Sequence, residues 1–306
     1  MANLNVHIPS LKLGDGNQIP MLGYGTGTSW YKRGDDSKID RALVEAAKTA
    51  IKLGYTYLDG AEVYGTESEL GLAIEESKVP QSDLFIVTKV LPNIADIPAA
   101  LQASLQKLKV DYVDLYLIHS QWFPGTDIAG ASDADIQKAW AAMEQVKELG
   151  LAKSIGVSNF LPKQLDAVMA TAKVKPVLNQ IEFHPYLQHM SSGLLEWHKK
   201  HGVATAAYGP LTPIVRGDTK DGELPAYLKS LASKYAVSEG EILLRWCIDQ
   251  DIVPVTTSSK EQRLSNYLRA MTFKLTPAEV QEIKSLGDKK HFRAFWPTKF
   301  DANDRS

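Results

Sequence analysis

Eight short runs of apolar residues recur along the chain, and several longer segments between them carry apolar residues at helical spacing. Strands that read as nearly continuous apolar runs, each followed by a helix, indicate a parallel sheet covered by helices. Eight such units predict an α/β protein with a closed (β/α)8 barrel, or TIM barrel. The strand-like runs are 21–25, 55–59, 84–89, 113–119, 154–159, 177–182, 203–209 and 251–257, and the helical segments include 41–54, 67–77, 97–109, 136–150 and 161–172.

The two ends of the chain do not fit this alternation. Residues 11–20 alternate apolar and polar positions around a Gly-Asp-Gly turn, which predicts a β-hairpin, and we expect residues 1–20 to cap the barrel. The segment from about 287 to 306 is long and irregular, and we expect it to form a C-terminal tail. Because no linker rich in proline, glycine or serine divides the chain, residues 1–306 are predicted to form a single domain.

Local signals mark several predicted boundaries. Thr66 and Glu69 fit a capping box at the start of a helix, and Gly54 and Gly150 stand where helices should end. Three glycines, at positions 23, 25 and 27, leave open a doubly wound nucleotide-binding sheet as the alternative fold. The match is poor, because the third fingerprint glycine would fall at Thr28 and a polar loop follows instead of a helix. We interpret these glycines as a tight turn from strand to loop.

Composition and charge narrow the class of partner. Hydrophobic residues make up 44% and charged residues 23% of the chain, so it can bury a sizeable core. The net charge is −2 and the basic residues are dispersed, which argues against nucleic acid as a partner. No signal peptide or apolar run of membrane-spanning length is evident, and the single cysteine, Cys247, excludes an internal disulfide. We therefore expect a cytoplasmic, soluble monomer that acts on small molecules and does not bind a membrane.

Polar residues end the predicted strands, and the carboxyl ends of barrel strands carry the active site in enzymes of this architecture. Asp59 ends the second strand, with Tyr64 in the loop behind it; Lys89 ends the third and His119 the fourth. A buried lysine needs an acid partner, and Asp59 is the natural one. A protonated Lys89 beside Tyr64 would stabilise the phenolate, so we expect a lowered tyrosine pKa and a usable general acid.

Such an acid suits addition of a nucleophile to a carbonyl, whose oxygen takes a proton while His119 donates a hydrogen bond to it. Neither a metal-ligand set nor a nucleophile with its base is evident, so we expect hydride from a nicotinamide cofactor. Taken singly, each of these residues has an ordinary structural reading: a turn cap, an exposed tyrosine, a rim lysine or a hydrogen-bonded histidine. Their joint position at three consecutive strand ends favours the catalytic reading.

Later strand ends offer groups for that cofactor. Ser158, Asn159 and Gln180 could bind a carboxamide, and Tyr208 could present its ring face to the nicotinamide. Ser158 and Asn159 could also cap the helix that follows them, and Gln180 and Tyr208 could simply pack in the barrel. A cationic pair at the start of the last barrel helix suits a 2′-phosphate, which favours NADPH over NADH, although a solvated helix surface is the alternative. The pair consists of Lys260 and Arg263.

Large aromatic residues in loops and in the tail are candidates for the wall of an apolar carbonyl pocket, because exposed aromatic side chains call for an explanation. Ordinary anchoring of loops is the alternative for each. They are Trp30, Tyr31, Trp122, Phe123, Phe295 and Trp296.

Six motifs, LDGAEVYG, IVTKV, LYLIHS, SIGVSNF, NQIEFHP and SSKEQR, follow one another along nearly the whole chain and resemble those of the aldo-keto reductases. The resemblance implies direct hydride transfer from NADPH to an aldehyde or ketone without a metal, with Tyr64 as the proton donor of a four-residue catalytic set. It adds to the cofactor site Gly209, Leu211, Thr257, Ser258, Ser259 and Asn266. The stretches GYGTGTSWYK and TTSSK further resemble a fungal branch of conjugated polyketone, ketopantoyl lactone and α-keto amide reductases, which implies an α-dicarbonyl, α-keto lactone or α-keto amide substrate.

The chain departs from the family pattern in the cofactor region. Thr257 stands where many members carry a lysine for the 2′-phosphate, so Lys260 takes over that contact or the preference for NADPH is weaker. Asn266 and Tyr267 differ from the usual adenine contacts. The alternatives to a carbonyl reductase of the fungal branch are an NADPH-binding regulatory subunit without catalysis, a sugar reductase of the aldose or xylose type, and a metal-assisted hydrolase, for which no ligand set is evident.

Overall fold

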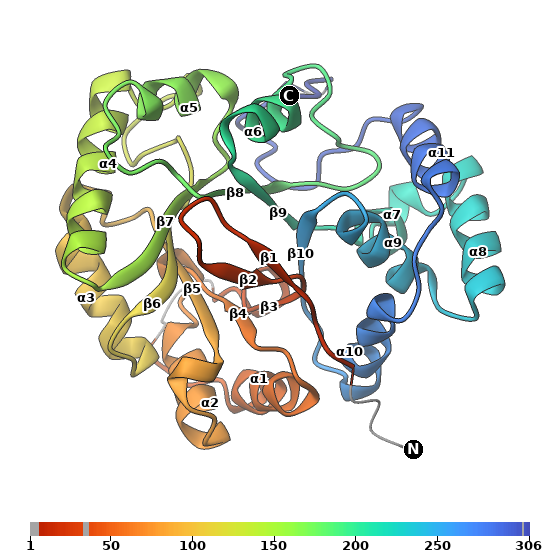
Figure 1. The fold of residues 1–306 in the computed structure, drawn as a ribbon, viewed down its shortest axis with the longest axis horizontal. Coiled ribbons are helices and arrows are strands. Elements are labelled where there is room, and N and C mark those ends of the chain that lie inside the picture. The colour runs from red at the N-terminus through yellow and green to blue at the C-terminus, as the bar shows by residue number, and fades with distance from the viewer. Residues whose placement is uncertain (1–5, 33–36, 302) are drawn as a thin grey trace.

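Eight parallel strands close into a barrel in the computed structural model, which describes residues 6–32, 37–301 and 303–306 (Figure 1). Each strand pairs with its neighbour in the sequence, and the last strand closes onto the first. The predicted (β/α)8 barrel is therefore confirmed, and the doubly wound alternative is wrong. The barrel strands are β3 (Gly23–Gly25), β4 (Tyr57–Asp59), β5 (Phe85–Val90), β6 (Val113–Ile118), β7 (Ala152–Ser158), β8 (Leu178–Glu182), β9 (Ala204–Tyr208) and β10 (Ile252–Thr256).

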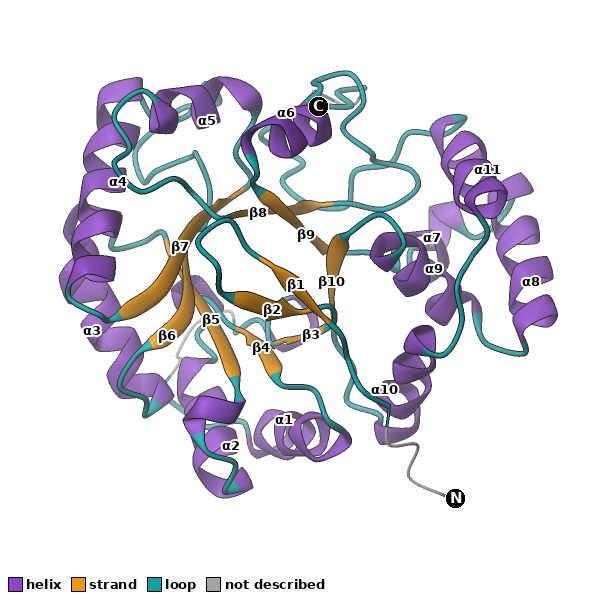
Figure 2. Cartoon of the chain, viewed as in Figure 1, coloured by secondary structure: helices purple, strands orange, loops and turns teal. Residues whose placement is uncertain are grey.

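Helices surround the barrel on its outer side (Figure 2). Nearly every residue of the barrel strands is buried, because helices cover the outer face of the sheet and side chains fill the interior. Among the described helices, none combines the length and the apolar character that crossing a bilayer requires. The helices are α1 (Arg41–Leu53), α2 (Glu67–Ser77), α3 (Ile97–Leu108), α4 (Asp133–Glu148), α5 (Pro162–Met169), α6 (Leu194–His201), α7 (Thr212–Val215), α8 (Glu223–Tyr235), α9 (Glu239–Ile248), α10 (Glu261–Leu268) and α11 (Pro277–Asp288).

The helix ends confirm two of the three local signals. Gly54 ends α1 with φ +102°, and Gly150 follows α4 with φ +73°, a backbone that favours glycine. The predicted capping box of Thr66 and Glu69 is wrong. The Thr66 hydroxyl donates to the backbone and side-chain oxygens of Thr26, while the Glu69 carboxylate accepts from the N–H of Asp40. Both side chains therefore bond to polar groups of neighbouring segments instead of to the first turn of α2.

The hairpin of β1 (Ser10–Lys12) and β2 (Gln18–Pro20) is antiparallel, as predicted. Its turn is attached near the start of β7, where Asn17 donates to the Ser154 hydroxyl at 2.9 Å and that hydroxyl donates to Asp15 at 2.8 Å. The hairpin therefore caps the amino ends of the strands, and residues 1–5 of the predicted cap lie outside the described residues. The C-terminal tail, which follows α11, lies at the opposite end of the barrel, where Trp296 contacts His119 and Tyr208.

Candidate active site

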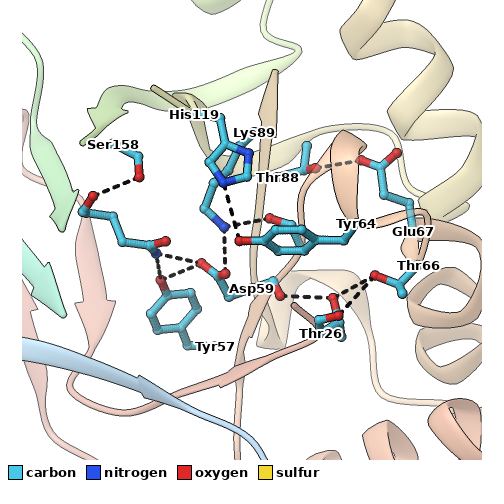
Figure 3. A network of polar contacts seen from close by, with 12 residues as sticks. Thr26, Tyr57, Asp59, Tyr64, Thr66, Glu67, Thr88, Lys89, His119 and Ser158 are labelled. Atoms are coloured by element: carbon cyan, nitrogen blue, oxygen red, sulfur yellow. Dashed lines mark hydrogen bonds and ion pairs between the residues drawn. The ribbon is translucent and has the colours of Figure 1, made fainter. Parts of the chain in front are cut away.

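The four side chains singled out at the strand ends come together at the carboxyl end of the barrel (Figure 3). Asp59 is the last residue of β4, Lys89 lies in β5, and His119 directly follows β6. Tyr64 ends a short 3-10 helix, Glu62–Tyr64, in the loop after β4. Because β4, β5 and β6 are adjacent in the barrel, their ends bring these groups within contact distance.

Lys89 and Asp59 form a buried ion pair, as expected. The Lys89 side chain is 0% exposed, and its Nζ lies 2.6 Å from Asp59 Oδ1 and donates to the Gly60 carbonyl at 2.7 Å. Burial, the largest single effect, would lower the pKa of the Lys89 ammonium, but Asp59 and Tyr64 together outweigh it and the pKa is raised above 10.5. Lys89 therefore stays positively charged.

Tyr64 is placed between this cation and the histidine. Lys89 Nζ lies 5.1 Å from the centroid of the Tyr64 ring, and Tyr64 Oη lies 3.5 Å from His119 Nε2. Burial raises the pKa of the phenol above its ordinary value of 10.0, and the Lys89 charge only partly opposes this. The expected lowering is wrong for the chain by itself, because desolvation of the phenolate outweighs its attraction to Lys89. Tyr64 therefore keeps its proton at neutral pH.

His119 is uncharged in this setting. Burial, and then the Lys89 charge, hold its pKa well below 6.5. Its Nδ1 is buried and has no hydrogen-bond partner among the described residues. A neutral imidazole carries one N–H, so His119 can donate one hydrogen bond to a group beside Tyr64.

The second carboxylate oxygen of Asp59 has partners that the sequence did not suggest. Tyr57 Oη donates to Asp59 Oδ2 at 3.0 Å, and Gln180 Nε2 donates to the same oxygen at 2.7 Å and to Tyr57 Oη at 3.2 Å. Tyr57 is fully buried. Its position two residues before Asp59, on the same side of β4, was the only available signal.

Two of the three glycines, Gly23 in β3 and Gly27 after it, make room for site residues. A Cβ at Gly23 would lie 2.7 Å from the Tyr57 ring, and a Cβ at Gly27 would lie 3.0 Å from the Tyr64 ring. Neither has a left-handed backbone. The interpretation that these glycines serve a tight turn is therefore wrong, because Gly23 and Gly27 instead allow the close approach of two aromatic rings.

The candidate cofactor residues of β7, β8 and β9 bond to one another. Ser158 Oγ donates to the Gln180 carbonyl at 2.7 Å, Asn159 Nδ2 donates to the His119 carbonyl at 2.9 Å, and Tyr208 Oη donates to Asn159 Oδ1 at 2.6 Å. These bonds place all of them beside the Tyr64 cluster. The expected capping of the next helix is wrong, because Leu161 precedes α5 and no side chain caps it.

The remaining cofactor candidates lie around the ends of β9 and β10. Gly209 has φ +67° and a ring edge of Phe295 against it, and Leu211 is buried. Lys260 precedes α10 and Arg263 lies in its first turn, both exposed. Three of the others accept hydrogen bonds: Thr257 from the Trp30 indole at 3.2 Å, Ser258 from the Lys260 N–H and Asn266 from Gln262. Ser259 is exposed.

The aromatic candidates divide into two groups. Tyr31 lies 6.0 Å from Tyr64 between ring centroids, and Trp296 lies 6.4 Å from His119 and 5.1 Å from Trp122. Tyr31 and Trp296 therefore flank the site, and Trp122 packs against Trp296. Trp30 instead bonds to Thr257, and Phe295 packs edge-on against Tyr208 at 5.2 Å. Trp122 and Phe123 were expected to be exposed but are 6% and 8% exposed; the tail accounts for Trp122, because Trp296 and Phe300 pack on it.

Comparisons with known proteins agree with this geometry. The sequence profile of the Aldo/keto reductase family matches residues 22–288. An NAD/NADP-dependent indole-3-acetaldehyde reductase of Schizosaccharomyces pombe is 40% identical over 92% of this chain and 96% of its own length. An NADPH-dependent alpha-keto amide reductase of Saccharomyces cerevisiae is 39% identical over 96% of both chains. The crystal structure of a Bombyx mori aldo-keto reductase in complex with NADP covers 92% of this chain and 93% of its own, with 34% identity and a TM-score of 0.81.

Proposed function

The chain belongs to the aldo/keto reductase family, and on that premise we propose that it reduces a ketone or aldehyde to the alcohol with NADPH. The observation that carries the proposal is the cluster around Tyr64. There a half-buried tyrosine that keeps its proton lies beside the buried Lys89–Asp59 ion pair. Such an arrangement suits a reaction in which a carbonyl oxygen gains charge and takes a proton.

Each member of the cluster has a role in this proposal. Tyr64 is the general acid, and its proton passes to the carbonyl oxygen as negative charge develops there. Lys89 stabilises the phenolate that remains, and Asp59 keeps Lys89 charged in its buried position. His119 donates its N–H to the same carbonyl oxygen. NADPH, when bound, supplies the hydride that reduces the carbonyl carbon.

The donor and acceptor set around Gln180 fits a nicotinamide carboxamide. Gln180 Nε2 is committed to Asp59 and Tyr57, while its side-chain oxygen accepts from no residue that the structure describes. That oxygen can accept from the carboxamide N–H. We assign Ser158, Asn159 and Tyr208 to the same ring, and the rest of the cofactor to Gly209, Leu211, Thr257, Ser258, Ser259, Lys260, Arg263 and Asn266. The exposed cations Lys260 and Arg263 favour NADPH over NADH.

The substrate we propose is an α-dicarbonyl, α-keto lactone or α-keto amide with an apolar or aromatic substituent. Tyr31 and Trp296 flank the reacting groups and Trp122 packs behind Trp296, and rings of this kind contact flat apolar groups well. A sugar would need several polar partners in that wall, so the aldose-type alternative is less favoured. The S. pombe relative is named for an aromatic acetaldehyde, which makes such aldehydes a second class to test.

The test follows loss of the nicotinamide absorbance with NADPH and with NADH, for the wild type and for Tyr64→Phe. The substrate panel holds α-keto amides, α-keto lactones, vicinal diketones, aromatic acetaldehydes and aldoses. We expect turnover of at least one panel class with NADPH, and loss of turnover in Tyr64→Phe while NADPH still binds by fluorescence titration. Binding of NADPH by the wild type without turnover of any carbonyl would instead support a regulatory subunit. We also expect a cytoplasmic monomer, and size-exclusion chromatography tests the oligomeric state.

A further inference from the structure

Glu182 is a buried carboxylate at the end of β8, and it bonds to the C-terminal tail. The residue is 2% exposed. Its Oε1 accepts from the backbone N–H of Ala294 at 2.6 Å and lies 2.9 Å from His184 Nε2, and its Oε2 accepts from the N–H of Phe295 at 3.1 Å. Two successive amides of the tail therefore converge on one charged group of the barrel.

These two bonds are the ones that join the tail backbone to a charged group of the barrel. Residues 289–306 form no helix or strand within the part that the structure describes. Other contacts of the tail with the barrel and its loops include the bonds of the Phe292 N–H to the Tyr186 carbonyl at 3.3 Å and of the Trp296 indole to Tyr208 Oη at 3.1 Å, and the packing of Trp296 on Trp122 and of Phe295 on Tyr208. Hydrogen bonds to a carboxylate are shorter and stronger than neutral ones, and a buried carboxylate strongly favours keeping its donors.

The segment that Glu182 holds carries Trp296 onto the site. The Trp296 ring lies 5.1 Å from Trp122 and 6.4 Å from His119, and its backbone has φ +59°. A tryptophan adopts this left-handed conformation only where the surroundings impose it. Because Trp296 directly follows the two residues bound by Glu182, its backbone is anchored there, while its ring also contacts Tyr208 and Trp122.

We propose that Glu182 is a positioning residue that sets substrate selectivity, because it docks the tail so that Trp296 forms one wall of the carbonyl pocket. This inference rests on the proposed function. Glu182 itself stays behind the tail backbone and contacts no substrate. Substrates with a large aromatic substituent reach Trp296 and depend on Glu182, whereas a small aldehyde does not.

The test compares Glu182→Gln with a matched control, Glu144→Gln. Glu144 likewise accepts from two successive backbone amides, of Lys173 at 2.6 Å and Val174 at 2.8 Å, but it lies on the outer helix α4. For Glu182→Gln we expect KM for an aromatic α-keto amide to rise about tenfold, with kcat changed less than about threefold and KM for a small aldehyde unchanged. Tryptic cleavage after Lys299, without cofactor, should be about fivefold faster. The control should match the wild type in each measurement.

A double variant tests whether Glu182 acts through Trp296. In a Trp296→Ala background, Glu182→Gln should raise KM no further, because the group that it positions is gone. A further rise there, or wild-type KM and cleavage rates in the single variant, would overturn the inference. If Glu182→Gln does not fold, Ala294→Pro removes one tail N–H without altering the barrel and is held to the same outcomes. The two conclusions fail separately. The proposed function fails if the wild type turns over no carbonyl in the Tyr64 assay, whereas the Glu182 inference alone fails if the wild type is active and Glu182→Gln behaves like it.

Discussion

Replacing Tyr57 by phenylalanine removes a single oxygen atom from the site and tests whether the Asp59 network serves catalysis. The ring keeps its packing, because it lies against Gly23 and contacts Phe85 edge-on at 5.6 Å. What is lost is the donor to Asp59 Oδ2 and the acceptor for Gln180 Nε2. The Gln180 bond to Asp59 at 2.7 Å remains.

The magnitude follows from these contacts. A hydrogen bond to a charged group contributes about 1.5–3 kcal/mol, and here one of the two donors to Asp59 Oδ2 survives. We therefore expect a loss of about 1–2 kcal/mol in the free energy of unfolding, since no cavity larger than one oxygen is left. The carboxylate and the Gln180 amide each lose one of the bonds that fix their orientation. We expect kcat/KM to fall about tenfold and the Kd for NADPH to rise about threefold.

The assay combines steady-state kinetics, fluorescence titration with NADPH and urea unfolding. Tyr55→Phe is the matched control, because Tyr55 is also fully buried and its Oη donates at 2.8 Å to the Leu264 carbonyl, away from Asp59. The control should lose stability to a similar extent and keep its kcat. Wild-type kcat/KM and NADPH affinity in Tyr57→Phe would refute the reasoning, as would an equal loss of activity in the control.

Three further predictions follow from burial. Carbonyl reduction should hold its kcat from about pH 6 to about pH 9 and decline only at higher pH, because Tyr64 must be protonated and its pKa is raised above 10.0; a decline between about pH 7 and 8 would contradict this. His198 has its pKa lowered by burial to about 3, so the unfolded chain binds the extra proton below pH 6.5. The free energy of unfolding should therefore fall by roughly 4 kcal/mol as the pH is lowered from 6.5 to 3. Urea unfolding of His198→Gln should show a flatter dependence of this free energy on pH. In Gly71→Ala, a Cβ would meet the Lys107 carbonyl oxygen at 2.2 Å, and we expect a loss of about 1–3 kcal/mol in urea unfolding rather than the gain typical of alanine in a helix.

The order of elements and the location of the reacting groups could be read from the chain alone. Apolar runs alternating with helical patterns encode strands and helices locally, and a closed parallel barrel brings all strand ends to one side. Asp59, Lys89 and His119 lie at or next to the ends of consecutive strands, so their meeting followed from position in the sequence. The hairpin and the ion pair could be predicted for the same reason, since a turn sequence and a buried lysine each have few solutions.

The tertiary structure decided what depends on partners from distant segments. Tyr57 and Gln180 share Asp59 across the barrel, and Glu182 meets tail residues more than a hundred positions away, contacts that no local pattern records. The direction in which the Tyr64 pKa shifts depends on the desolvation of the phenol in the folded chain, which outweighs the nearby cation. Local sequence thus determined which groups reach the carboxyl end of the barrel, whereas three-dimensional packing determined how each is bonded, charged and covered.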